Sequence, residues 1–324
     1  MAKNEKKIGK LHKITVGKVL IYTFLTLWAA TTIFPFVWVV NNSFKGPNKI
    51  LRNSFVPCFS NSLNYDAVTG EKITKENEET DIAEHRNNFV SPTMRNFKRA
   101  FNLGATEKTK LSVMNAYKQS IIISGSVTIF VMLFAGMAGF AMSRYRFFGR
   151  GFLRIIITAS LMFPSFSTII PLLRMMTSFN LISNPLAVIL PLIASNMSFA
   201  MLILIGYVEG LPVDLEEAAF LEGCNVFQIF FKVIFPISLP SFSTVAIFTF
   251  LWSYNDLFFQ NILITDRLKK PICALLNFIS SQWGGTDYGL MCAAVTLVVV
   301  PVLIVYMLLQ KNIVKGLTAG AIKG

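Results

Sequence analysis

The chain has 324 residues, of which 53% are hydrophobic and 15% are charged, and its formal net charge is +13. A mean hydropathy of +0.56 is too high for an ordinary soluble domain. Lysine and arginine mostly flank apolar segments, and they form no basic helix interleaved with stacking aromatic residues. The positive charge therefore indicates how the chain is oriented in a membrane, because basic residues favour the cytoplasmic side. We expect no nucleic-acid partner.

Six stretches are long and apolar enough to cross a hydrocarbon core of about 30 Å. Backbone groups in a bilayer need internal hydrogen-bond partners, so each stretch is predicted to be helical. The pattern predicts an all-α membrane protein with six transmembrane helices. These predicted spans are Val19–Val40, Ala116–Met142, Phe152–Met176, Pro185–Tyr207, Ile237–Ile264 and Gly289–Gln310.

The spans also predict how the chain is organised. A basic tail (1–18) is followed by the first transmembrane helix (19–42) and a long loop (43–110). The transmembrane core then covers 111–311, and a short tail covers 312–324. Six lysines place the N-terminal tail in the cytoplasm by the positive-inside rule. An even number of spans then puts both termini in the cytoplasm and the loop outside, where it is interpreted as a tolerated insertion or a contact for an external partner.

The connection between the fourth and fifth spans, 208–236, contains a short predicted helix. Pro212 suits a first helical turn, where its missing N–H costs nothing, and the acidic residues that follow favour the positive end of the helix dipole. Gly223 suits the C′ position, where φ is usually positive. We therefore expect a helix from Pro212 to Glu222 that ends in a glycine turn.

A second helix is predicted to follow this turn. Asn225 can cap it, and Gln228 stands three residues later, as in a capping box. The first helix carries adjacent alanines that let another backbone come close, with carboxylates beside them that can pair with a partner's arginine. This pattern favours a helix that docks onto a partner protein, although a plain interfacial amphipathic helix has the same composition. One face carries, by helical spacing, Leu215, Ala218, Ala219 and Glu222.

The same segment resembles a known family. It resembles the EAA signature of binding-protein-dependent ABC importer permeases. The matching pattern is Glu217-Ala218-Ala219, then three residues, Gly223, nine residues and Val233-Ile234-Phe235-Pro236. Val233 and Phe235 are conservative departures from the usual ending of the signature. The likeness runs from about Val19 to the end and fails over roughly 54–88. Three further stretches resemble the later permease subunit of the maltose-type carbohydrate importers: Phe140–Arg150, Trp252–Asp256 and Lys315–Gly324.

The resemblance implies the fold of a type I ABC importer, with a cytoplasmic EAA coupling helix, in a bacterial cell membrane. It also implies four kinds of partner: a second homologous permease subunit, an ABC ATPase dimer, an extracytoplasmic sugar-binding protein or lipoprotein, and membrane lipids. ATP-driven closure of the ATPases would switch the pore between inward-facing and outward-facing states. The residues expected to couple to the ATPase are Asp214, Glu217, Ala218, Ala219, Glu222 and Gly223.

The chain has no sequence motif for catalysis or for cofactor binding. It contains no G-x-x-x-x-G-K-[ST] phosphate loop, and its four cysteines and two histidines form no metal-ligand spacing. We therefore expect no catalytic site, no cofactor and no metal in this chain. The resemblance implies that the partner ATPase subunits bind ATP and magnesium and carry out the hydrolysis.

A candidate solute pathway lies in the fifth predicted span. Asp256 is the acidic residue placed well inside a span, and a charge there should face a cavity or a partner. Aromatic and amide side chains nearby suit sugar binding by stacking and hydrogen bonding. A helix–helix contact or an interfacial aromatic anchor is the plainer interpretation. The candidate pathway residues are Asn196, Trp252, Tyr254, Asn255 and Asp256.

These observations favour a permease subunit of an ATP-driven importer for a sugar or an oligosaccharide. One alternative is an EAA-type permease for a non-sugar solute such as a peptide or an ion. The other alternative is a secondary transporter, which needs several charged ion-coupling residues inside the membrane and usually internal repeats.

Overall fold

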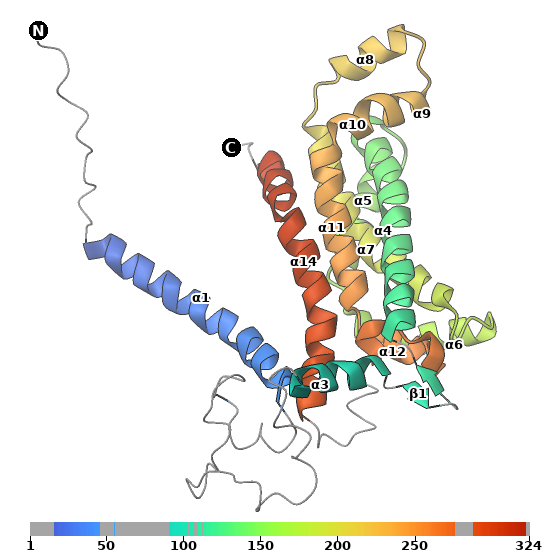
Figure 1. The fold of residues 1–324 in the computed structure, drawn as a ribbon. Helices are drawn as coiled ribbons and strands as arrows, with labels where there is room; N and C mark the ends of the chain where they lie inside the picture. The colour runs from blue at the N-terminus through green and yellow to red at the C-terminus, as the bar shows by residue number, and fades with distance from the viewer. Residues whose placement is uncertain are drawn as a thin grey trace, which may run out of the picture.

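A computed structural model describes residues 16–45, 55, 91–102, 104–106, 109–111, 113–275 and 288–321 (Figure 1). Most of these residues are helical, and the long helices run side by side in a bundle. One end of the bundle carries α8 (Asp214–Leu221), and the opposite end carries α3 (Ser91–Asn102) and α12 (Phe258–Leu263). We call these the α8 end and the α12 end.

The first helix, α1 (Val16–Ser43), diverges from the bundle (Figure 1). None of its most apolar stretch is buried. Its C-terminal end is held at the α12 end of the bundle, where Asn96 Nδ2 of α3 donates hydrogen bonds to the carbonyl oxygens of Ser43 and Lys45, each at 2.8 Å. Lys45 itself is buried and donates to Asn42 Oδ1 at 3.0 Å.

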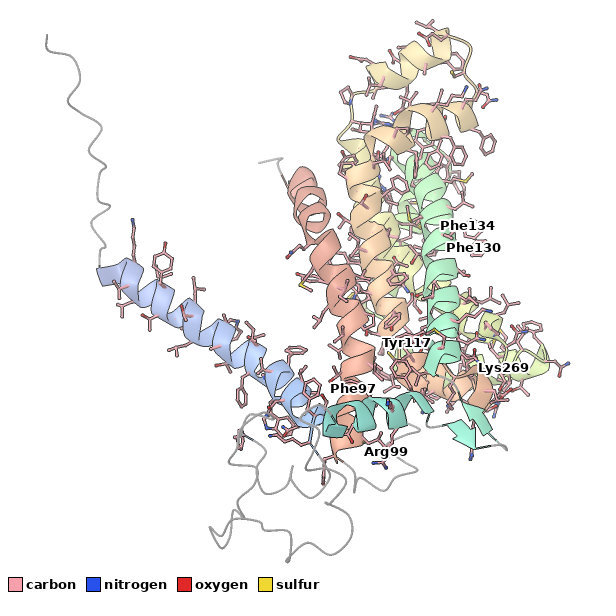
Figure 2. All side chains as sticks on the ribbon, in the orientation of Figure 1. Phe97, Arg99, Tyr117, Phe130, Phe134 and Lys269 are labelled. Carbon is pink, nitrogen blue, oxygen red and sulfur yellow. The ribbon has the colours of Figure 1, made fainter. Side chains whose placement is uncertain are left out.

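Four helices form the core of the bundle: α4 (Val113–Arg144), α7 (Pro185–Glu209), α11 (Leu239–Asn255) and α14 (Tyr288–Ala321). A Cβ atom on Gly136 of α4 would lie 2.7 Å from the Phe242 ring of α11, so only glycine permits this approach. Figure 2 shows Phe130 and Phe134 on the side of α4 that faces away from α11 and α14. Both rings are exposed, as expected for a surface covered by lipid.

Pro164 and Pro171 in the predicted span Phe152–Met176 indicate a kink or an unwound segment, and the structure confirms a break there. The segment folds into α5 (Arg150–Ser160), a 3₁₀ turn η2 (Ser165–Thr168) and α6 (Ile169–Ser178). Pro164 precedes the 3₁₀ turn with an extended backbone at φ −71° and ψ 122°. A proline lacks the N–H that a continuing helix needs, and it disfavours helical geometry in the residue before it. The apolar run therefore contains two short helices.

The prediction of a helix over Ile237–Ile264 is wrong at its far end. α11 stops at Asn255, and Asp256 is extended, with φ −68° and ψ 102°. The Asp256 carboxylate accepts hydrogen bonds from the backbone N–H groups of Phe259 (3.2 Å) and Gln260 (3.4 Å), at the start of α12. An aspartate that caps a new helix in this way competes with continuation of the old one.

The predicted loop 43–110 lies largely outside the described residues. Its last part forms α3 and a small antiparallel hairpin of β1 (Gly104–Thr106) and β2 (Thr109–Leu111), in which Ala105 pairs with Lys110. At the other end of the chain, α14 continues to Ala321, well beyond the predicted span. A one-turn 3₁₀ helix, η4 (Arg267–Lys269), follows α12.

In the described residues, four helices are long and apolar enough to cross a membrane. A fifth candidate is the bent pair Val226–Ile237 and Leu239–Asn255, whose two parts meet at 82°. The first part of this pair consists of α9 (Val226–Ile229), a π-helical turn η3 (Phe230–Ile234) and α10 (Phe235–Ile237). The chain is therefore a multi-pass membrane protein of mostly helical structure.

Candidate functional site

The turn at Gly223 confirms the predicted end of the first short helix. Gly223 has φ +84°, a conformation that favours glycine. Its N–H donates to Phe220 O at 3.0 Å, and the N–H of Cys224 donates to Ala219 O at 3.1 Å. These are the two bonds of a Schellman motif. The helix itself begins two residues later than predicted, so Pro212 precedes α8 instead of lying in its first turn.

The capping box that opens α9 is also confirmed. Asn225 Oδ1 accepts from the N–H of Gln228, and Gln228 Oε1 accepts from the N–H of Asn225, both at 2.9 Å. Two donors that a helix start leaves unpaired are thereby satisfied. α8, Gly223 and α9 thus form a helix–turn–helix unit whose angle is set by local bonds, and we call it the α8–α9 unit.

The surface of α8 is polar along one part and apolar at its end. Asp214, Glu217 and Glu222 are exposed, and the side chains of Phe220 and Leu221 are 70% and 87% exposed. The two alanines differ, because Ala218 is exposed whereas Ala219 is buried against the bundle. This exposed surface of carboxylates and large apolar side chains has the composition of a protein-docking surface.

An ion pair that the sequence analysis missed ties α8 to α4. Arg144, the last residue of α4, donates from Nε to Glu216 Oε1 at 2.5 Å and from Nη2 to Leu211 O at 2.9 Å. The two side chains are only 10% and 13% exposed. In the sequence, Arg144 is one of the basic residues that flank the second predicted span, and nothing there indicates its partner. A hollow of about 750 Å³ lies beside the pair, between α8 and the residues after α4.

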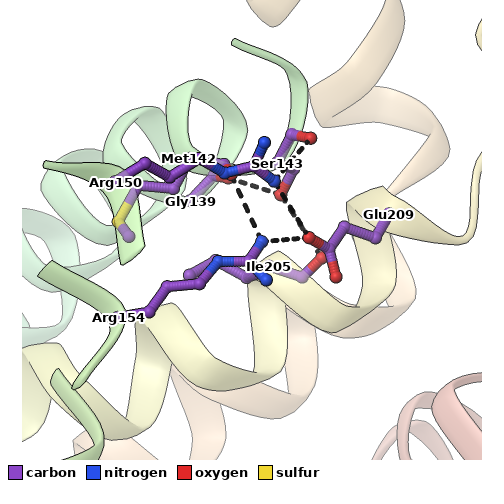
Figure 3. Close-up of polar contacts among 7 residues, drawn as sticks. All are labelled: Gly139, Met142, Ser143, Arg150, Arg154, Ile205 and Glu209. Carbon is purple, nitrogen blue, oxygen red and sulfur yellow. Dashed lines mark hydrogen bonds and ion pairs between the residues drawn. The ribbon is translucent and has the colours of Figure 1, made fainter. Parts of the chain in front are cut away.

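Figure 3 shows a second group of charges near the same end of the bundle. Glu209, the last residue of α7, accepts hydrogen bonds from Arg150 (3.3 Å) and from Arg154, both on α5. The two guanidinium groups also donate to the carbonyl oxygens of Ser143 and Met142 at the end of α4. Cations at a helix C-terminus are favourable, and this group links α5 to the ends of α4 and α7.

Three of the five predicted pathway residues line one cavity. Its volume is about 380 Å³, and it lies between α7, α11 and the breaks that follow α5 and α11. The Trp252 ring is 47% exposed and meets the Phe199 ring edge-to-face, with centroids 4.7 Å apart. Within the part of the chain that the structure describes, no ion pair involves Asp256. The residues facing the cavity include Phe166, Ser195, Asn196, Phe199, Trp252 and Asp256.

The other two predicted pathway residues do not line this cavity. Tyr254 is buried in a separate apolar cluster with Val113 and Ile272, on the other side of α11. Asn255 is exposed and donates to the carbonyl oxygen of Leu251 in its own helix at 2.9 Å. Asn196 lines the cavity, and one N–H of its amide donates to Leu192 O at 2.7 Å, so its second N–H and its carbonyl oxygen are left for a ligand.

The chain is similar to several transport proteins. Residues 112–319 match the family described as binding-protein-dependent transport system inner membrane component. The probable ABC transporter permease protein YurM of Bacillus subtilis is 27% identical, over 99% of this chain and 93% of its own. The diacetylchitobiose uptake system permease protein NgcG of Streptomyces coelicolor is 29% identical, over 93% and 88%. The trehalose/maltose transport system permease protein MalG of Thermococcus litoralis is 27% identical, over 97% and 100%.

A solved structure has the same fold. It is a chain of a bacterial ABC transporter involved in the import of the acidic polysaccharide alginate, with a TM-score of 0.69 and 18% sequence identity. The match covers 94% of this chain and 98% of that one. The match over residues 112–319 shows that the chain belongs to the family of binding-protein-dependent transport system inner membrane components.

Proposed function

We propose that the chain is a permease subunit of an ATP-driven importer for a sugar or an oligosaccharide, in the bacterial cytoplasmic membrane. Six spans cross the bilayer, with α5, η2 and α6 forming a broken third span and α11 the fifth. Both termini and the α8 end are cytoplasmic, and the loop 43–110 and the α12 end are extracytoplasmic. The basic N-terminal tail supports this orientation.

The α8–α9 unit is the observation that carries the proposal. It projects from the bundle in Figure 1, its angle is set by the Schellman turn and the capping box, and its apolar tip is exposed. An exposed apolar tip bordered by carboxylates is typical of a protein–protein interaction site. We propose that it docks into an ABC ATPase subunit, which binds ATP and magnesium. The proposed coupling residues remain Asp214, Glu217, Ala218, Ala219, Glu222 and Gly223.

The cavity at Trp252 and Asp256 is proposed to be this subunit's part of the solute pathway. Aromatic rings suit stacking on the apolar faces of sugar rings, and a carboxylate suits their hydroxyl groups as an acceptor. The cavity opens on one side of the bundle, so a second homologous permease subunit would complete it. An extracytoplasmic solute-binding protein would deliver the solute at the α12 end.

The printed names of similar proteins support a sugar over other solutes. They refer to diacetylchitobiose, to trehalose and maltose, and to galactooligosaccharides. An EAA-type permease for a peptide or an ion remains the alternative, but no feature of the cavity favours it. The secondary-transporter alternative has no support, because the family consists of components of binding-protein-dependent systems.

The proposed function is tested by purifying the tagged chain from its native membrane in mild detergent and identifying the proteins that accompany it. We expect a second permease of the same family and an ATPase with a phosphate-binding loop. A chain that is recovered alone or as a homo-oligomer would contradict the proposal. Any accompanying solute-binding protein can then be screened against neutral, acidic and amino oligosaccharides.

The pathway is tested separately with Trp252→Ala in cells that depend on the importer. Uptake of the solute identified in that screen should fall, because the largest aromatic surface of the cavity is removed. Phe248→Ala is the matched control, since Phe248 packs on Trp252 with ring centroids 5.5 Å apart but does not line the cavity. Equal uptake by the two variants would remove Trp252 from the pathway.

A further inference from the structure

α8 is attached to the bundle by few contacts. Among its eight residues, all described, Ala219 alone is buried. The connection from α7 is only Gly210 to Val213, and on the other side Gly223 begins a turn. Apolar burial of a single alanine stabilises a helix position only weakly, since hydrophobic free energy scales with buried area. Another interaction must therefore decide how firmly α8 follows the bundle.

The Arg144–Glu216 pair supplies that interaction. Both side chains are largely withdrawn from water, where an unpaired charge would be costly, so separating them is strongly unfavourable. The guanidinium also binds Leu211 O, in the connection between α7 and α8. The Arg144 side chain thus binds both the first turn of α8 and the segment that connects α7 to α8. Arginine suits this role because its planar group donates to two acceptors at fixed angles.

The helix that carries the donor of these bonds, α4, runs the length of the bundle. α4 extends from Arg144 at the α8 end to Val113 at the α12 end, where Ser120 Oγ accepts from the N–H of Ile272 at 2.9 Å. Between these points α4 packs closely on α11 at Gly136 and shares one continuous core with α7, the helix that carries Asn196. A displacement of α4 therefore reaches the helices that line the solute cavity.

The neighbouring Glu209 group is different in kind. Its carboxylate and the Arg154 side chain are each 38% exposed, and the bonds join α5 to the ends of α4 and α7 without touching α8. Exposed pairs of this type contribute little to stability and are weakened by salt. The Glu209 group holds α5 to the bundle. Among the residues that the structure describes, only the Arg144–Glu216 ion pair joins the bundle to the docking helix.

We propose that Arg144 and Glu216 are positioning residues for coupling: their ion pair makes α8 and α4 move as one body, so that displacement of α8 by the ATPase reaches the solute cavity. Neither residue needs to touch solute or nucleotide. The proposal rests on the proposed function of α8 as the ATPase-docking helix. It adds that docking alone is not sufficient, because the force must also pass through this pair.

The test uses the purified importer complex and a reporter that needs no knowledge of the solute. Ser195→Cys is introduced into the exposed cavity wall, in a chain whose own cysteines are replaced by alanine, and its labelling by fluorescein maleimide is followed with and without ATP and vanadate. In the parent, trapping the nucleotide should change the labelling rate. In Arg144→Glu and in Glu216→Arg this change should be lost, although the ATPase still co-purifies and hydrolyses ATP.

The double variant with both charges exchanged is the decisive measurement. It should recover about half or more of the parent's nucleotide response, because it restores the opposite charges at the same positions. Arg146→Glu is the matched control, as it makes the same charge change at an exposed position two residues away and should respond like the parent. Where Arg144→Glu fails to assemble, Glu216→Gln removes one charge with little change in shape and should lose the response as well.

Two results would overturn the proposal. One is a parent-like response in the single variants or in Glu216→Gln. The other is an exchanged pair that retains the ATPase but recovers no response. A parent complex that contains no ATPase, or that shows no nucleotide response, would instead contradict the proposed function, so the two failures are distinguishable.

Discussion

The α8–α9 unit and the solute cavity differ in how far apart in the sequence their parts lie. The bonds that shape the unit join residues three to five positions apart, from Ala219 to Gln228. The cavity joins residues from Leu161 to Phe259, on several helices. A surface that docks to a partner can thus be set by local geometry, whereas a solute cavity depends on the packing of the whole bundle. Substitutions of Phe230, Gly223 and Asp256 test this contrast, and they follow in order of decreasing expected effect.

The largest effect is expected where the α8–α9 unit meets the bundle. Phe230 is 4% exposed, and its ring packs among Phe140, Phe235 and Phe242. Phe230→Ala should lower the free energy of unfolding by about 3–5 kcal/mol, the cost of emptying a buried aromatic site. Thermal unfolding of the purified chain measures this loss.

Phe231→Ala is the matched control, because Phe231 is the next residue and is 48% exposed. It should change stability by much less than Phe230→Ala. Equal losses would mean that the attachment of the unit does not depend on burial in the bundle, and the contrast between local and long-range structure would then fail.

An intermediate effect is expected at Gly223. A β-branched residue is strained at φ +84°, so Gly223→Val should destabilise the turn by about 1–2 kcal/mol and misdirect α8. Gly223→Asn should be tolerated, since asparagine adopts this conformation at low cost. Co-purification of the ATPase should persist in both variants, with the nucleotide response of the cavity reduced only in Gly223→Val. Similar responses would show that the angle of the turn is not important.

The smallest effect separates two roles of Asp256. Asp256→Ala removes the acceptor at the start of α12 and should cost about 1 kcal/mol. Asp256→Asn keeps an acceptor of the same shape and should leave stability close to that of the parent while removing the charge from the cavity. Reduced solute uptake by Asp256→Asn at unchanged thermal stability would support a role in the pathway. Unchanged uptake would leave Asp256 as a helix cap alone.

The breaks inside two of the predicted spans have a common physical reason. Hydrophobicity over 20 or more residues predicts that a segment is buried in lipid or protein, but it does not distinguish one long helix from two short ones. Pro164 and Asp256 each end a helix inside an apolar run, by a missing donor and by a competing carboxylate. Pro164 can be identified from the sequence as a source of kinks, whereas the capping role of Asp256 requires knowledge of where the next helix begins.

Features that depend on neighbours along the chain could be predicted from the amino-acid sequence. Apolar runs predicted the membrane-spanning helices, Gly223 predicted the turn after α8, and Asn225 with Gln228 predicted the cap of α9, because backbone conformation and capping act over a few residues. Contacts between residues far apart in the chain became visible only in the folded structure. Arg144 and Glu216 are 72 positions apart, and Tyr254 and Trp252 lie on opposite sides of one helix. Such contacts depend on how α4, α7 and α11 pack together, and neither composition nor spacing determines that packing.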